Sequence, residues 1–145
     1  MATKYLSAAR IKHLEVIQTV ISRMAHNSFL IKGWSISIAT ALFALAAKDG
    51  SARFPLIAGI TIIALWYLDA FYLRQEKIFR NFYNKVLSSK DNSIELFSLD
   101  VRDFTADVKS VLKIMVAECN LVFHGVIFIL SLIIFIFLYG PSCFL

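Results

Sequence analysis

Charged residues are scarce in this sequence, and their scarcity excludes most classes of soluble protein. Only 17% of its 145 residues are Asp, Glu, Lys or Arg, whereas 59% are hydrophobic. An average soluble domain has about 25% charged and about 45–50% apolar residues. The mean hydropathy of +0.71 agrees with this comparison. The composition therefore predicts a membrane protein, and the length is that of one domain.

Chemically reactive motifs are also missing. The two cysteines, Cys119 and Cys143, lie at opposite ends of an apolar run and could not pair within one helix, so we expect no disulfide framework. The three histidines have no metal-site spacing, and the sequence has no Gly-rich phosphate loop, GxSxG, HExxH or CxxC motif. Catalysis needs a positioned acid, base or nucleophile. We therefore expect neither an enzyme nor a bound metal or cofactor.

Three apolar runs have the length that crosses a bilayer. They cover residues 29–47, 55–73 and 121–139, and each is near the ~20 residues that span a hydrocarbon core of ~30 Å. The alternative is a soluble helical protein with a very apolar core. The third run argues against it, because only His124 and Ser131 are polar there and a soluble helix needs a polar face.

The distribution of basic residues predicts the orientation. The segment between the first two runs has the turn chemistry of Asp49 and Gly50, followed by Pro55, which suits the first turn of a helix. This turn contains only Lys48 and Arg53 as basic residues, and the tail after the third run contains none. The others lie before the first run's centre or between the second and third runs: Lys4, Arg10, Lys12, Arg23, Lys32, Arg74, Lys77, Arg80, Lys85, Lys90, Arg102, Lys109 and Lys113. The positive-inside rule then places the N-terminus and the long segment in the cytoplasm, and the C-terminus outside.

The net charge of +5 has two readings. It is compatible with nucleic acid binding or with anionic lipid. In so apolar a chain the cytoplasmic face of a lipid bilayer is the expected partner, and no nucleic acid is expected.

Helical periodicity continues beyond the apolar runs. Apolar residues recur at a spacing of three or four, which is typical of helices with one buried face. The stripes are Leu14, Ile17, Ile21, Met24 and Ile31, with Ser28 in the gap; Phe71, Ile78, Phe79, Phe82 and Val86; and Val101, Phe104, Val108, Val111 and Met115.

These stripes predict an all-α membrane protein that forms a single domain over residues 1–145. Helical extensions at about 4–28 and 74–118 would continue the three spans into a cytoplasmic bundle. The polar cluster Ser88–Ser93 predicts a loop. Asp100, with Asp103 in the following turn, is expected to begin a third helix that reaches Tyr139 and is roughly 60 Å long.

Two charged residues inside the apolar runs fall at the same depth. Lys32 lies 16 residues before Lys48, and Asp69 lies 16 residues after Arg53. Antiparallel helices that leave one turn with the same rise reach equal depth after equal counts, so we expect Lys32 and Asp69 to be level with each other. Trp34 and Trp66 are matched in the same way, and tryptophan favours the membrane interface. One interpretation is an ion pair that fixes the register of the hairpin, and the other is the mouth of a water-filled path.

Three further groups of polar or small residues are candidates. His124, six positions after Glu118, either titrates near neutral pH or bonds to a neighbouring helix. Small residues on the first run indicate close helix packing, within the chain or between protomers: Gly33, Ser37, Ala41 and Ala44. The charged group after the second run is interpreted as a lipid-facing collar or as a surface that couples the cytoplasmic helices to the spans: Arg74, Glu76, Lys77 and Arg80.

The runs RMAHNSFLIKGWSISIATALFALAA and WYLDAFYLRQEKIFRNFYNKV resemble a family of small bacterial membrane proteins. The SLATT membrane effectors associated with antiphage defence are the nearest group, and the resemblance covers residues 14–87. It implies a homo-oligomeric effector of the bacterial inner membrane, such as a pore that a soluble protein partner or a nucleotide signal activates. The alternative is a non-conducting anchor that recruits a soluble partner through its cytoplasmic helices.

Overall fold

The computed structural model describes residues 8–88 and 97–140, and within these ranges the chain forms helices and no strand. The helices are α1 (Ala8–Asp49), α2 (Arg53–Ser88), a short 3-10 helix η1 (Arg102–Phe104), α3 (Val111–Met115) and α4 (Glu118–Tyr139). By length and composition α1, α2 and α4 could each cross a membrane. The prediction of an all-helical chain with three long apolar helices is confirmed.

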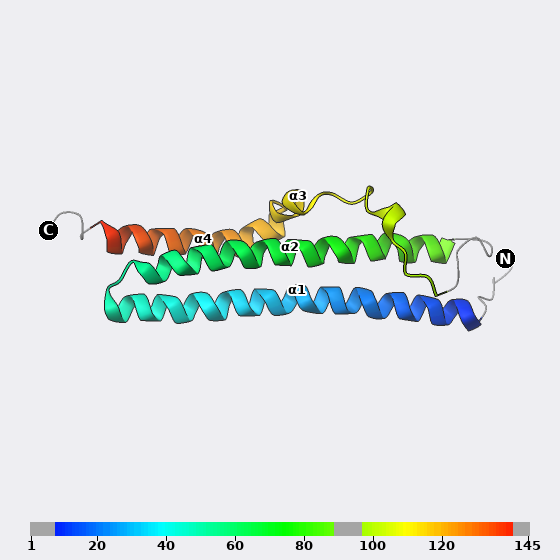
Figure 1. Ribbon diagram of the computed structural model, residues 1–145, viewed down its shortest axis with the longest axis horizontal. Coiled ribbons are helices and arrows are strands. Elements are labelled where there is room, and N and C mark those ends of the chain that lie inside the picture. The colour runs from blue at the N-terminus through cyan, green and yellow to red at the C-terminus, as the bar shows by residue number, and fades with distance from the viewer. Residues whose placement is uncertain (1–7, 89–96, 141–145) are drawn as a thin grey trace.

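α1 and α2 form a long antiparallel hairpin, and α4 lies along the half of α2 nearest the turn (Figure 1). α2 packs against both α1 and α4, whereas α1 contacts α4 much less. The turn and the C-terminal end of α4 lie at one end of the molecule. The beginning of α1 and the end of α2 lie at the other (Figure 1). Each apolar helix therefore runs in the direction opposite to that of the preceding one.

The turn has the chemistry that the sequence predicted. α1 ends at Asp49, and Gly50 adopts a left-handed φ of 62°, which costs glycine nothing. The amide of Gly50 donates to the carbonyl of Ala46 at 2.9 Å and closes the last turn of α1. Pro55 lies in the first turn of α2, where it needs no intrahelical donor.

α4 approaches α2 closely near this turn. The hydroxyl of Ser131 donates to the carbonyl of Pro55 at 2.5 Å, so the polar group of an apolar helix is satisfied by another helix. A Cβ atom on Gly59 would lie 3.3 Å from the Ser131 Oγ and 3.7 Å from a ring carbon of Phe128. The absence of a side chain at Gly59 is therefore what permits this contact.

The far half of the hairpin has a separate apolar core. Leu14, Ile17 and Ile21 of α1 pack with Phe82 and Val86 of α2. These residues belong to the predicted stripes, and so do Ile31 and Ile78, which are also buried. Three members of the stripes behave differently, because Met24 and Phe79 are half-buried and Phe71 is exposed.

Phe71 is exposed because α2 buries a different face at its level. Between the turn and the middle of the hairpin, α2 is covered by α1 and α4 and buries Asp69 and Ala70. Further along, α4 is absent and the segment that contains Val101 and Phe104 covers α2 instead. The helical period of the sequence cannot predict that α2 changes its packing partner from α4 to this segment.

The continuous third helix expected from about Asp100 to Tyr139 is wrong. The chain forms η1, an irregular segment and the single turn of α3, and it breaks again at Ala117 before α4 begins. Backbone carbonyls that a continuous helix would use are bonded to α2 instead. Arg74 donates to the carbonyls of Thr105 and Lys109, and Trp66 donates to that of Met115.

The apolar residues of the predicted third stripe are partly covered although they are not in one helix. All five are half-buried: Val101, Phe104, Val108, Val111 and Met115. The predicted loop Ser88–Ser93 lies outside the described residues except for Ser88, with which α2 ends, and residues 4–7 of the first extension are also outside them.

Candidate functional site: a buried charged cluster

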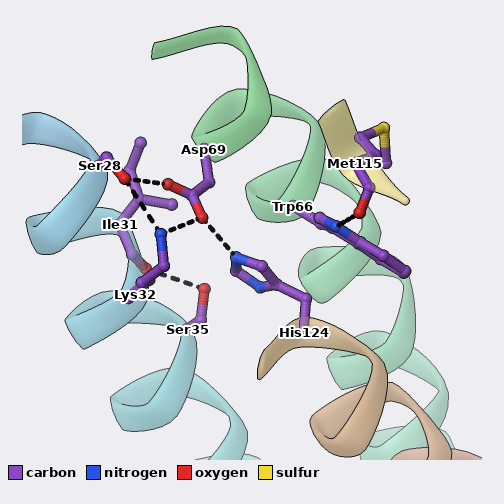
Figure 2. A network of polar contacts seen from close by, with 8 residues as sticks. All are labelled: Ser28, Ile31, Lys32, Ser35, Trp66, Asp69, Met115 and His124. Carbon is purple, nitrogen blue, oxygen red and sulfur yellow. Dashed lines mark hydrogen bonds and ion pairs between the residues drawn. The ribbon is translucent and has the colours of Figure 1, made fainter. Parts of the chain in front are cut away.

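Polar side chains from three helices meet in the middle of the apolar bundle. Ser28 and Lys32 lie one turn apart on α1, Asp69 comes from α2 and His124 from the first turns of α4 (Figure 2). Counting residues from the turn predicted that Lys32 and Asp69 lie at the same level, and in the structure their side chains are in contact. The helices place the other three groups around the carboxylate of Asp69.

The carboxylate of Asp69 accepts hydrogen bonds on both oxygens. Its Oδ1 accepts from the Ser28 hydroxyl at 2.5 Å, and its Oδ2 lies 2.5 Å from the Lys32 Nζ and 3.0 Å from the His124 Nε2. The Lys32 ammonium also donates to the Ser28 Oγ at 3.0 Å. Asp69 and His124 are fully buried, while the Lys32 side chain keeps 24% of its surface exposed. A buried charge needs such partners, because an unpaired one costs several kcal/mol.

The hydrogen bonding of His124 indicates its tautomer. Its Nε2 faces a carboxylate oxygen that can only accept, so this nitrogen carries a proton. Its Nδ1 is buried without a hydrogen-bond partner in the described part of the chain, which suits a bare ring nitrogen better than an N–H group. A neutral imidazole also leaves the charges of Lys32 and Asp69 balanced.

Trp66 connects the cluster to the junction of α3 and α4. Its ring stacks on the imidazole of His124, with centroids 6.0 Å apart and an angle of 19° between the planes. Its Nε1 donates to the carbonyl of Met115 at 3.0 Å (Figure 2). One aromatic side chain of α2 therefore orients the histidine and also satisfies a carbonyl at the break in the chain.

The sequence did not predict that Ser28 and His124 share one carboxylate. A signal for Ser28 was present, since it is the polar residue in an otherwise apolar stripe. Of the two interpretations of His124, the structure has the bond to a neighbouring helix. Asp69 has no exposed surface in the single chain, so it does not face a water-filled path there.

The small residues of α1 do not pack within the chain, so that alternative is wrong. All four are exposed: Gly33, Ser37, Ala41 and Ala44. The small residues that face the bundle are Ser35, Ala39 and Ala46, which lie on the opposite side of the helix. A Cβ atom on Gly33 would meet nothing within 4 Å. The exposed group is called the small-residue face below.

The charged residues after Leu73 have different roles. The Arg74 guanidinium donates to the carbonyls of Lys109 at 3.2 Å and Thr105 at 2.9 Å, so it fastens the irregular segment to α2. Arg80 and Glu76 instead pair with each other at 2.7 Å on the surface of α2. Of the three residues predicted for coupling, Arg74 is the one that bonds to a different element.

The cluster can hold the three helices in register. The Ser28 hydroxyl contacts the carboxylate and the ammonium, and this is not the serine–histidine contact that activates a nucleophile. Among the described residues, no group of three or more His, Cys, Asp or Glu could hold a metal ion.

No protein-family model, curated protein or solved structure matches this chain. The resemblance to SLATT membrane effectors therefore stays a prediction. The function has to be argued from the cluster and from the surfaces of the helices.

Proposed function

We propose that this protein is an oligomeric inner-membrane effector that forms a pore or otherwise perturbs the bilayer, in antiphage defence. The observation that carries the proposal is the small-residue face of α1, which is exposed and lies opposite the face that packs on α2. Small residues let helix backbones approach closely in a membrane, where packing rather than hydrophobic burial drives association. The defence role follows from the resemblance alone.

The apolar surface of the three helices supports a position in the bilayer. In the most apolar 18-residue stretch of α4 only 11% of the residues are buried. Ile129, Ile133 and Phe137 are 56%, 56% and 75% exposed. Water is a poor solvent for such a surface and lipid tails are a good one. In the proposed orientation the turn and the end of α4 face outward, and the opposite end of the hairpin is cytoplasmic.

The charged cluster acts in this proposal as the lock that fixes the three helices. Asp69 and His124 have no exposed surface, so ions would cross an assembly between protomers and not through one chain. A fixed register is useful there, because it presents the same small-residue face to each neighbour. A soluble protein or a signal molecule would then act on the cytoplasmic end to open the assembly.

The proposal is tested by measuring mass and ion flux on the purified protein. We expect a homo-oligomer in detergent and dye release from liposomes. Gly33→Leu/Ala41→Leu should reduce both, because the larger side chains separate the helices that pack there. Ala64→Leu is the matched control, since Ala64 is an exposed small residue on α2. A monomer that releases no dye would overturn the proposal.

A second candidate function is a non-conducting anchor that recruits a soluble protein. It is favoured by a surface hollow of about 490 Å³ between the beginning of α1 and the end of α2. Ile11 and Leu87 line it and are 47% and 49% exposed, and Glu15 and Gln18 supply polar groups. An anchor predicts a stable heterocomplex and no dye release, so the same flux assay separates the two functions.

A further inference from the structure

A second polar hollow lies on α2 just beyond its apolar half. It has a volume of about 420 Å³ and is formed between α2 and the irregular segment that precedes α3. The polar side chains that line it are Lys77, Arg80, Asn81, Asn84, Asp107 and Lys109. It is separate from the charged cluster around Asp69, and we call it the basic hollow.

One wall of the basic hollow is a face of α2, and the other is the irregular segment before α3, which Arg74 fastens to α2. Lys77, Asn81 and Asn84 lie on one side of α2, because they are four and three residues apart. The opposite wall carries Asp107 and Lys109. Arg74 holds this wall in place through its hydrogen bonds to the backbone carbonyls of Thr105 and Lys109, and the Lys109 side chain remains available.

The charges of the hollow suit an anion with several oxygen atoms. Lys77 and Lys109 are exposed, and their side chains form no ion pair within the part of the chain that the structure describes. Arg80 is 60% exposed at its side chain and shares its charge with Glu76. The amides of Asn81 and Asn84 add neutral donors. Among the described residues, two unpaired ammonium groups and the Glu76-paired guanidinium of Arg80 therefore face a single lining carboxylate, Asp107, and the balance favours a phosphate group.

The level of the hollow favours a lipid as the source of the phosphate. The second apolar run ends at Leu73, and Lys77 lies about 6 Å beyond it at a rise of ~1.5 Å per residue. The headgroup layer is about 5–8 Å thick on each side of the hydrocarbon core. Arg80 lies further out, and its long side chain can reach back towards the interface.

We propose that the basic hollow binds the headgroup of an anionic phospholipid of the cytoplasmic leaflet. Lys77, Arg80 and Lys109 contact its phosphate. The hydroxyl groups of a glycerol headgroup, as in phosphatidylglycerol, donate to the carboxylate of Asp107, which otherwise would repel an anion. The assignment rests on the membrane placement of the proposed function but not on pore formation.

The test measures binding of short-chain phosphatidylglycerol to the full-length protein in a neutral detergent, by titration and native mass spectrometry. The phosphatidylcholine analogue, which is zwitterionic and has no net charge, is the comparison. We expect saturable binding of phosphatidylglycerol only. In Lys77→Gln/Lys109→Gln the dissociation constant should rise about tenfold, because each basic residue near a leaflet contributes to the attraction. Dye release, measured in parallel, reports separately on the pore.

The matched control is Arg23→Gln/Lys113→Gln, which removes two exposed basic residues from the same end of the protein but outside the hollow. We expect its dissociation constant to stay within about twofold of that of the unchanged protein. Equal weakening in both double variants would mean a diffuse attraction and overturn the site. Binding of inorganic phosphate or a nucleotide without binding of phosphatidylglycerol would overturn the lipid assignment.

Discussion

Replacing Asp69 with asparagine removes the charge at the centre of the buried cluster and leaves its shape nearly unchanged. An asparagine oxygen can accept from Lys32 and His124, and its amide can donate to the Ser28 Oγ. The number of hydrogen bonds is therefore almost conserved. What the substitution removes is the negative charge that lies 2.5 Å from the Lys32 ammonium.

We estimate the cost of Asp69→Asn as about 2 kcal/mol of unfolding free energy. Hydrogen bonds to charged groups contribute about 1.5–3 kcal/mol, and polar contacts between membrane helices reach about 1.7 kcal/mol at most. The Lys32 side chain is 24% exposed, so without Asp69 its ammonium can turn towards the membrane interface, which lowers the free-energy cost of Asp69→Asn. Lys32→Met should cost a similar amount, because it leaves a buried carboxylate without its cation.

The double variant Lys32→Met/Asp69→Asn decides whether the charges interact. Because both charges are gone, it should lose about 2 kcal/mol and not the sum of about 4. The assay is reversible unfolding in mixed detergent micelles, followed by circular dichroism. Asp49→Asn at the exposed turn removes the same charge and should cost less than about 0.5 kcal/mol. Additive losses in the double variant would refute the ion pair. Exchanging the two charges is a poorer test, because His124 donates to residue 69 and a lysine there cannot accept.

Three further substitutions test the local structure. Trp66→Phe keeps the aromatic ring but removes the donor to Met115, so it should cost about 1 kcal/mol and increase hydrogen exchange at the junction of α3 and α4. Protection unchanged at that junction would contradict this role. Gly59→Val should destabilise the packing of α2 on α4 by about 1–3 kcal/mol, whereas Gly125→Val on α4 should cost less, since its Cβ would meet only the Leu121 side chain, at 3.9 Å. Equal melting temperatures for these two variants would show the approach of the helices to be looser than the structure has it. Gly50→Ala should cost about 1–2 kcal/mol in thermal unfolding because of its φ of 62°, and an unchanged melting temperature would contradict the left-handed turn.

That Lys32 and Asp69 lie at the same depth could be predicted, because their depth depends only on the number of residues between each of them and the turn. The rise of a helix is constant, and the turn at Gly50 marks where both counts begin. The same one-dimensional information located α1, α2 and α4, since their apolar length is a property of sequence alone. The paired stripes of the hairpin followed from the helical period.

The partners of the cluster and the break before α4 were decided by the tertiary structure. α4 is apolar on nearly every side, so its sequence does not determine which face meets α2, and only packing turned His124 towards Asp69. The predicted third helix contains no helix-breaking residue at Ala117, yet the chain breaks there, between α3 and α4. Before this break, Arg74 and Trp66 of α2, which are distant in sequence, bind backbone carbonyls of the chain. Sequence thus determined the length and level of the helices and the turn of the hairpin, whereas long-range contacts determined the rotation of α4 and the break before it.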